Sequence, residues 1–204
     1  MTRSKSSRAW LERHVSDPYV HRARPRGYRS RAAFKLLEIA ARDRLLARGQ
    51  VVVDLGAAPG GWAQVAAAKV GPTGCVIAVD LLEMAPVAGV TVIGGDFANA
   101  ETRAALDAAL AGRPVDVVLS DMSPNLSGIA ATDQARSLAL CEAAVAFALE
   151  RLKPGGVLLM KGFQGAGFPE LLARMRREFA TVAARKPDAS RRRSSEMYLC
   201  ARRR

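Results

Sequence analysis

The sequence predicts an α/β fold, a mostly parallel sheet of seven strands with helices on both faces. Two observations favour this class. Short, almost wholly apolar runs recur along the chain, as is typical of strands that are buried on both faces. Between them lie stretches with apolar residues at helical spacing, and this alternation favours a doubly wound parallel sheet. No internal repeat or low-complexity linker divides the chain, so we expect one domain with basic additions.

The predicted elements follow one another from Ser30 onward. In the first helix Ala33, Phe34 and Leu37 recur at helical spacing, and Gly49 follows its end. Further helices are predicted at 61–69, 101–110, 132–153 and 168–178. Strands are predicted at 51–56, 75–80, within 89–97, and at 115–121, 155–161, 179–184 and 196–202.

Residues 1–29 are predicted to form a basic arm ahead of a domain at 30–204. Pro18 and Pro25 are expected to prevent a helix in "DPYVHRARPRG". The first residues are basic and are not followed by an apolar stretch, so no secretory signal is expected.

The charge of the chain is concentrated at its two ends. Residues 1–48 carry a net charge of +9 and residues 185–204 a net charge of +6, whereas residues 49–184 carry −3. Basic ends on a near-neutral body are typical of a nucleic-acid binder. Aromatic side chains interleave with the first basic segment, which favours RNA or DNA over a merely solvated surface. The candidate phosphate contacts are Arg24, Arg26, Arg29, Arg31, Arg191, Arg192 and Arg193.

Cysteine usage and hydropathy argue against several other classes of protein. Cys75, Cys141 and Cys200 are isolated and odd in number, so neither a disulfide framework nor a zinc site is expected. No apolar run approaches the ~18 residues of a membrane span. We therefore expect a cytoplasmic protein without a metal and without a membrane partner. The sequence contains no recognisable dimerisation segment, which favours a monomer.

The turn "DLGAAPGGW" after the first strand is the leading candidate for a ligand loop. Gly56, Gly60 and Gly61 let the backbone adopt unusual angles and approach a ligand closely. The turn is neither GxGxxG nor followed by GK[ST], so a dinucleotide or a triphosphate is not the favoured ligand.

Acidic residues end or follow each of the first four strands of the predicted sheet. They are Asp54, Asp80, Asp96 and Asp121, and the carboxyl ends of parallel strands form the ligand-binding edge of such sheets. Carboxylates there accept hydrogen bonds from hydroxyls and amines, as a nucleoside requires. Asp80 is predicted to hold the ribose hydroxyls, and Asp96 with Phe97 the adenine edge.

The chain resembles the FtsJ-like ribose 2′-O-methyltransferases nearly from end to end. The motifs that carry the resemblance are "SSRAWLERHVSDPYVHRA", "YRSRAAFKLLEI", "DLGAAPGGW", "GDF", "LSDMSPNLSG", "LLMKGFQG" and "RRRSSEMYLC". The resemblance implies a Rossmann-like methyltransferase domain at 30–204 that uses S-adenosylmethionine. The expected cofactor-binding residues are Gly56, Ala57, Pro59, Gly60, Gly61, Trp62, Asp80, Asp96, Phe97 and Asp121.

The resemblance also implies a catalytic tetrad of Lys35, Asp121, Lys161 and Glu196. Lys161 follows the apolar run 157–160, although lysine is almost never fully buried without a partner. It is the expected base, which orients the ribose hydroxyl and takes its proton. Burial, Lys35 and the cofactor's positive charge favour a neutral amine, whereas Asp121 and Glu196 favour the ammonium; the sequence leaves this balance open.

The family resemblance implies a substrate in the large ribosomal subunit, the A-loop uridine of 23S ribosomal RNA. Two alternatives stay open: the same chemistry on the anticodon loop of transfer RNA, and a non-catalytic RNA-binding factor in ribosome assembly. Two other methylations are less favoured. "DMSPN" lacks the Pro-Pro-aromatic arrangement used for exocyclic amines, and no cysteine is placed to attack cytosine C5.

Overall fold

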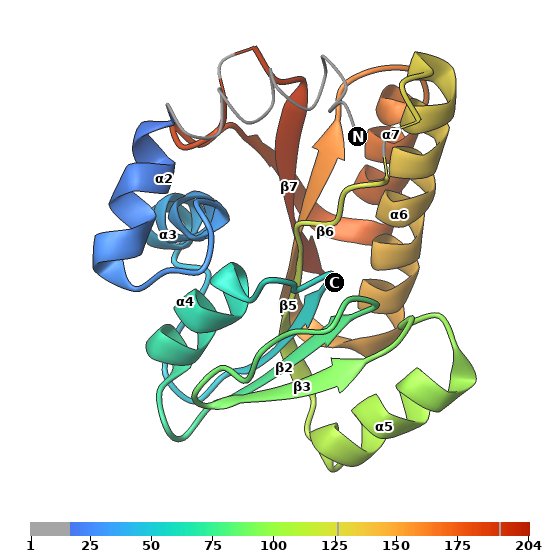
Figure 1. Cartoon of the computed structure of the whole chain (residues 1–204). Helices are drawn as coiled ribbons and strands as arrows, with labels where there is room; N and C mark the ends of the chain where they lie inside the picture. Colours follow the sequence, from blue (N-terminus) through green and yellow to red (C-terminus); the bar gives the residue numbers. More distant parts are fainter. Residues whose placement is uncertain (1–16, 126, 192) are drawn as a thin grey trace.

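The computed structural model describes residues 17–125, 127–191 and 193–204 (Figure 1). Its strands are β1 (Val51–Leu55), β2 (Cys75–Asp80), β3 (Val90–Gly94), β4 (Val115–Ser120), β5 (Leu152–Phe163), β6 (Phe179–Arg185) and β7 (Glu196–Arg203). Its helices are α2 (Pro18–Ala23), the short 3-10 helix η1 (Arg24–Arg26), α3 (Ala32–Asp43), α4 (Gly61–Val70), α5 (Ala100–Leu110), α6 (Ala130–Arg151) and α7 (Phe168–Glu178).

The seven strands form one sheet in the order β3-β2-β1-β4-β5-β7-β6. The pairs from β3 to β5 are parallel, whereas β7 runs antiparallel to both β5 and β6. The predicted mostly parallel seven-stranded sheet is therefore confirmed. The strand order reverses between β1 and β4, and in sheets of this kind ligands bind outside the carboxyl ends of the strands at that point.

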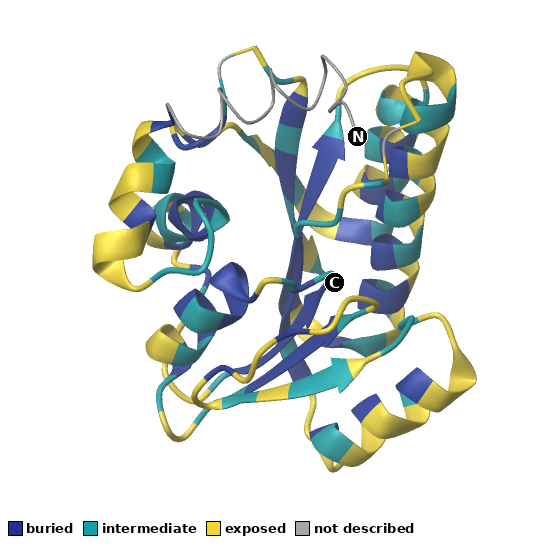
Figure 2. Cartoon of the chain, viewed as in Figure 1, coloured by how far each residue is buried: buried dark blue, intermediate teal, exposed yellow. Residues whose placement is uncertain are grey.

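Helices cover both faces of the sheet, with α3 and α4 on one side and α5, α6 and α7 on the other (Figure 1). Successive strand residues point to opposite faces, so β1 contributes to both cores. Val53 and Leu55 pack with α5 to α7, and Val52 packs with α3 and α4. All five residues of β1 are buried, which explains why every one of them except Asp54 is apolar (Figure 2).

Several element boundaries differ from those predicted. Helix α3 ends at Asp43, well before Gly49, because Arg44 adopts a left-handed conformation with φ 49° and its N–H bonds to the Ala40 carbonyl oxygen. Such a left-handed residue satisfies a carbonyl that the helix end would leave unpaired. Strand β5 begins at Leu152, earlier than the predicted 155.

The prediction that the prolines prevent a helix before residue 27 is wrong for Pro18–Ala23. Pro18 occupies the first turn, where its missing N–H costs nothing, and Asp17 caps the helix by accepting a hydrogen bond from the Tyr19 N–H at 3.0 Å. Tyr19 packs against Phe34 of α3, with ring centroids 5.5 Å apart. Residues 1–16 of the predicted arm lie outside the described residues, and the division at 29/30 stays a prediction.

Within the described part of the chain, no helix is both long enough and apolar enough to cross a bilayer.

Candidate active site

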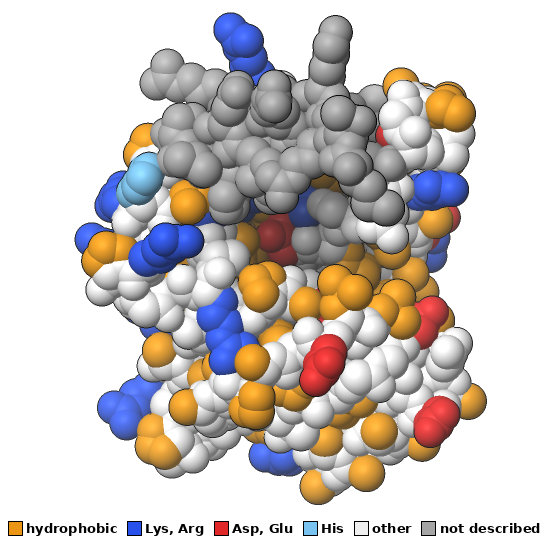
Figure 3. All heavy atoms as spheres, in the orientation of Figure 1, with side chains coloured by type: hydrophobic (Ala, Val, Ile, Leu, Met, Phe, Trp, Pro, Cys, Tyr) orange, Lys and Arg blue, Asp and Glu red, His pale blue; other side chains and the backbone are white. Residues whose placement is uncertain are grey.

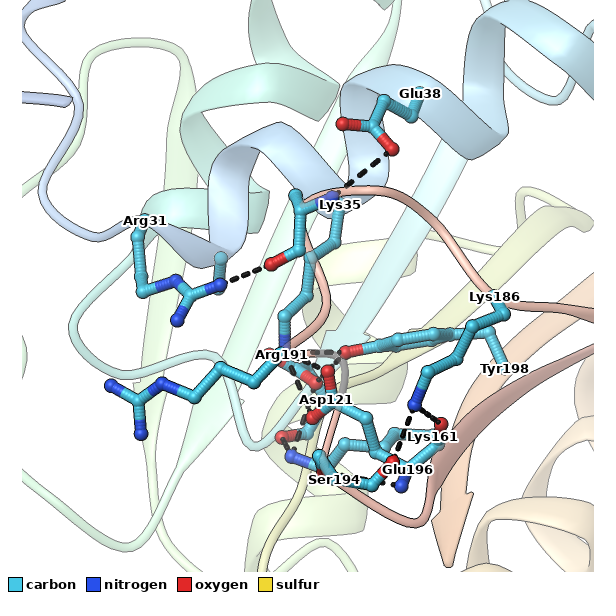
Figure 4. A network of polar contacts seen from close by, with 12 residues as sticks. Arg31, Lys35, Glu38, Asp121, Lys161, Lys186, Arg191, Ser194, Glu196 and Tyr198 are labelled. Carbon is cyan, nitrogen blue, oxygen red and sulfur yellow. Dashed lines mark hydrogen bonds and ion pairs between the residues drawn. The ribbon is translucent and has the colours of Figure 1, made fainter. Parts of the chain in front are cut away.

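The four predicted tetrad residues come together from four different elements (Figure 4). Lys35 lies on α3, Asp121 directly follows β4, Lys161 lies on β5 and Glu196 begins β7. Because β4 and β5 are parallel neighbours, Asp121 and Lys161 meet at one sheet edge. Because β7 is antiparallel to β5, its first residue, Glu196, reaches the same edge opposite Phe163.

Lys161 is buried at the end of the apolar part of β5, with 8% of its surface exposed. Its Nζ donates to the Asp121 main-chain oxygen at 2.6 Å and lies 3.1 Å from Asp121 Oδ1. A lysine is tolerated at the end of a core strand here because a carboxylate and a carbonyl replace its water.

Lys35 is buried to the same extent and pairs with the other carboxylate of the tetrad. Its Nζ lies 3.0 Å from Glu196 Oε1 and donates to the Tyr198 hydroxyl at 2.9 Å. The Tyr198 hydroxyl in turn donates to Asp121 Oδ1 at 2.8 Å. A continuous chain of hydrogen bonds therefore links Lys35 through Tyr198 and Asp121 to Lys161.

Tyr198 is a site residue that the sequence analysis missed. It is fully buried and lies opposite Lys161 in the β5–β7 ladder. Burial raises its pKa well above the usual value, and the negative charges of Asp121 and Glu196 raise it further. The hydroxyl therefore stays protonated and donates. The available signal was its spacing from Glu196, because residues two apart on a strand share a face.

Glu196 is held as a carboxylate despite its burial. Burial alone raises its pKa, but the positive charge of Lys35 and the hydrogen bond that Lys35 donates lower it more strongly, so the net shift is downward. Lys186 fixes the chain before β7, because its Nζ donates to the main-chain oxygens of Ser194 and Glu196, at 2.6 Å each (Figure 4).

The predicted cofactor edge is built from loops that follow β1, β2 and β3. Asp80 accepts the Ala58 N–H with Oδ2 and the Leu82 N–H with Oδ1, both at 2.8 Å. Asp96 Oδ1 accepts the Ala98 N–H at 2.9 Å. Each carboxylate oxygen has a second lone pair, so these acceptors fit an adenosine, whose ribose diol and exocyclic amine donate.

Gly56 provides the close approach of backbone that the first turn requires. Its φ is +69°, a conformation that residues with a Cβ rarely adopt. A Cβ at this position would lie 2.3 Å from Cγ of Met122, the residue after Asp121. Glycine therefore lets the loop after β1 pack against the loop after β4.

Asp54 lies close enough to Asp80 and Asp121 for their charges to act on it, but unlike them it is buried inside a strand. It sits inside β1, between its partners on β2 and β4, and is 1% exposed. Burial raises its pKa well above the usual value, and the negative charges of Asp121 and Asp80 raise it further. The backbone of Ala63 in α4 acts on this pKa in the opposite direction.

Two aromatic residues of the predicted cofactor set have clear packing contacts. Trp62 is 3% exposed, and its indole N–H donates to the Ala32 carbonyl oxygen at 2.8 Å. Its ring packs against Tyr198, with centroids 5.8 Å apart. Phe97 packs edge-on against Phe147 of α6. Their contacts with a cofactor stay predictions, as do those of Ala57, Pro59 and Gly61.

The seven arginines predicted to bind phosphate fall into three groups. Arg24, Arg26 and Arg193 are exposed. Arg31 and Arg191 pair with Asp17, and Arg29 donates to main-chain carbonyls, so these guanidinium groups are engaged within the protein. Arg192 lies outside the described side chains.

The face seen in Figure 3 is hollowed in the middle, and an acidic side chain lies at the bottom of the hollow. Hydrophobic side chains line its lower rim, and Lys and Arg side chains gather to the left, over the layer of α2 to α4. Among the residues that the structure describes, no group of three or more His, Cys, Asp and Glu side chains is placed to hold a metal ion.

The chain is similar to known proteins over almost its whole length. Residues 28–204 match the FtsJ-like methyltransferase family. A protein of Azoarcus sp. named ribosomal RNA large subunit methyltransferase E is 56% identical to this chain, and the match covers 98% of this chain and 97% of the relative. The same name is carried by a 55% identical protein of Neisseria meningitidis, with 97% and 96% covered.

Solved structures agree with the sequence comparison. A protein named a ribosomal RNA methyltransferase from Plasmodium falciparum superposes with a TM-score of 0.76 at 26% identity, covering 86% of this chain and 98% of that chain. A protein named an rRNA methylase from Clostridium thermocellum has a TM-score of 0.58 at 17% identity, with 84% and 97% covered, and supports the fold alone. Together with the family match, these findings place the chain in the FtsJ-like methyltransferase family.

Proposed function

We propose that this methyltransferase transfers a methyl group from S-adenosylmethionine to a ribose 2′-hydroxyl of 23S ribosomal RNA in the large ribosomal subunit. The observation that carries the proposal is the buried chain of hydrogen bonds that joins Lys35, Tyr198, Asp121 and Lys161. The names of the close relatives, which refer to large-subunit ribosomal RNA, support the substrate class.

A ribose hydroxyl is a weak acid, so its methylation requires in-line positioning and a group that takes the proton. S-adenosylmethionine supplies an electrophilic methyl group when it is bound. Lys161 is the proposed base, because its amine lies at the sheet edge beside Asp121: it would accept the hydroxyl proton and become an ammonium that the Asp121 carboxylate stabilises. Lys35, held by Glu196 and Tyr198, is the proposed contact for the ribose or its phosphate.

The cofactor site is proposed at the loops after β1, β2 and β3. Asp80 would hold the ribose diol and Asp96 the adenine amine, because these carboxylates lie at the sheet edge with acceptor capacity left. Gly56 and Gly60 would allow the backbone of the first loop to approach the cofactor. Asp121 lies between the two sites, since it follows β4 next to Met122 and the first loop.

The proposed target is the A-loop uridine, with exposed Arg24, Arg26 and Arg193 as phosphate contacts. The proposed setting is a cytoplasmic monomer acting on the assembled subunit. Methylation of a transfer RNA anticodon loop is the second candidate, because the same tetrad serves that reaction equally well.

The test is tritium transfer from S-adenosylmethionine to purified large ribosomal subunits that lack the modification, with transfer RNA assayed in parallel. The proposal predicts label in 23S ribosomal RNA, recovered after digestion as a 2′-O-methylated uridine. Label on transfer RNA alone would contradict the proposed substrate and make transfer RNA the substrate of the enzyme. Binding of cofactor and RNA without any methyl transfer would contradict the proposed reaction and favour a non-catalytic RNA-binding protein.

A further inference from the structure

Arg29 lies among exposed arginines, yet its guanidinium faces the protein. Nη1 donates to the main-chain oxygens of Pro59 at 3.2 Å and Ala85 at 2.6 Å, and Nη2 donates to that of Pro86 at 2.5 Å. Three carbonyl acceptors occupy the group that would otherwise contact a phosphate.

These carbonyls belong to two different loops at the cofactor edge. Pro59 lies in the first loop, residues 56–60 after β1, and Ala85 and Pro86 lie in the second loop, residues 81–89 after β2. Asp80 joins the same two loops, because its carboxylate accepts N–H groups from Ala58 of the first and Leu82 of the second. An anion and a cation therefore cross-link the two loops at separate points.

Gly60 lies where the first loop, the second loop and the Arg29 side chain approach one another closely. A Cβ on Gly60 would lie 3.1 Å from Arg29 Nη1, from Met84 Sδ and from Val87 Cγ2. The guanidinium, the first loop and the second loop are thus in contact at one point, and a shift of Arg29 would release both loops there.

Arg29 is itself held in place by Gln64 of α4. The Arg29 N–H donates to Gln64 Oε1 at 2.9 Å, and Gln64 Nε2 donates to the Gly27 carbonyl oxygen at 3.0 Å. The backbone of Arg29 is therefore fixed to the helix that begins directly after the first loop.

We infer that Arg29 is a positioning residue for the cofactor: it holds the first and second loops at the separation at which Asp80 binds adenosine. The inference rests on the proposed function, because it assumes that this edge binds S-adenosylmethionine. A lysine would replace it only in part, since its three donors share one nitrogen, whereas arginine reaches the three carbonyls from two nitrogens of a planar fork.

Calorimetric titration with S-adenosylhomocysteine, the stable product of the cofactor, tests the inference on wild type, Arg29→Ala, Arg29→Lys and Arg26→Ala. Arg29→Ala is expected to raise the Kd about tenfold, which corresponds to about 1.4 kcal/mol. The Kd of Arg29→Lys is expected to lie between those of Arg29→Ala and wild type, and the Kd of Arg26→Ala is expected to match that of wild type. In filter binding of a 23S ribosomal RNA fragment, only Arg26→Ala is expected to bind RNA more weakly than wild type.

Two further readouts separate this role from general stability. The KM for S-adenosylmethionine is expected to rise in Arg29→Ala while kcat stays within about twofold of wild type. The rise in Tm that the ligand causes is expected to shrink in this variant, whereas a purely structural role would lower the Tm without ligand and leave that rise unchanged. If Arg29→Ala does not fold, Gln64→Ala is titrated in its place, with a Kd about threefold above wild type expected.

An unchanged Kd in Arg29→Ala, or in Gln64→Ala where it replaces that variant, would overturn the inference. A loss of RNA affinity in Arg29→Ala with normal Kd would also overturn it and make Arg29 a phosphate contact. Failure of the wild type to bind S-adenosylhomocysteine at all would instead remove the proposed function on which the inference depends.

Discussion

Tyr198 connects the two lysines of the site through a single hydroxyl. It accepts from Lys35 and donates to Asp121; Lys35 and Tyr198 are buried, and the Asp121 side chain is 18% exposed. In a water-poor site an unmade hydrogen bond is costly, so each of these contacts helps to fix the geometry of the amines. The tetrad is better described as five residues held in one network.

Replacing Tyr198 with Phe is therefore expected to slow methyl transfer about thirtyfold, because Lys35 and Asp121 each lose a partner worth roughly 1 kcal/mol. Single-turnover rates at saturating cofactor and RNA measure the effect. The affinity for S-adenosylhomocysteine is the control and is expected to stay within about twofold of wild type. A normal rate with a lower Tm would make Tyr198 a packing residue only.

Glu196 gives the site a pH-dependent stability. Its pKa is lowered in the folded protein, so its ionised form contributes stability above the ordinary value of 4.5, and this contribution is lost as pH falls below it. Glu196→Gln is expected to lower the free energy of unfolding by about 2 kcal/mol at pH 7, since Lys35 loses its counter-charge.

Urea unfolding of wild type and Glu196→Gln from pH 7 to pH 3 checks this expectation. The difference between the two proteins is expected to shrink below pH 4.5. A difference that stays constant through this range would show that Lys35 does not depend on the charge of Glu196.

At the scale of elements, the first loop depends on the absence of a side chain at Gly56. Gly56→Ala is expected to cost about 1–2 kcal/mol for its left-handed backbone, and in addition to displace Met122. Gly155→Ala is the matched control variant, because the φ of Gly155 is +76° and nothing lies within 4 Å of the place where its Cβ would be.

Both variants are expected to lose similar backbone stability in urea unfolding, but only Gly56→Ala is expected to lose affinity for S-adenosylhomocysteine, by tenfold or more. Equal affinities in the two variants would separate the Met122 contact from cofactor binding.

The strands and the mostly parallel sheet were predictable because buried parallel strands are continuous apolar runs with sharp ends, whereas the antiparallel direction of β7 was not predicted. Helix α2 was not, because the same Pro18 that breaks a helix interior is favoured in the first turn, and only the capping contact of Asp17 distinguishes the two. The role of Arg29 was hidden for a different reason. Its partners are carbonyls of two distant loops, and main-chain acceptors leave no signature in the residue types.

The site itself was predictable as far as it repeats a family pattern. All four tetrad residues are found together, and their register follows from β4, β5 and β7. Asp54 differs from the other acids because it lies within β1, where its side chain points to the face that α3 and α4 cover and is buried there.

At the scale of the whole molecule, the exposed arginines predict that RNA binding depends on salt. Three phosphate contacts from Arg24, Arg26 and Arg193 give an expected slope of log K against log salt of about −2 to −3, because each contact releases counterions. Replacing all three with alanine is expected to reduce the slope by about 2. An unchanged slope in filter binding would place the phosphate contacts elsewhere on the basic ends.

The central claim, that the Lys161 amine accepts the proton of the ribose hydroxyl, is tested most directly by single-turnover methyl transfer with Lys161→Arg. Arginine keeps the charge and much of the reach but does not give up its proton. The account predicts a rate about 10²- to 10⁴-fold below wild type at saturating cofactor and RNA, with both still bound. A rate equal to that of wild type would contradict it and leave Lys161 an electrostatic role alone.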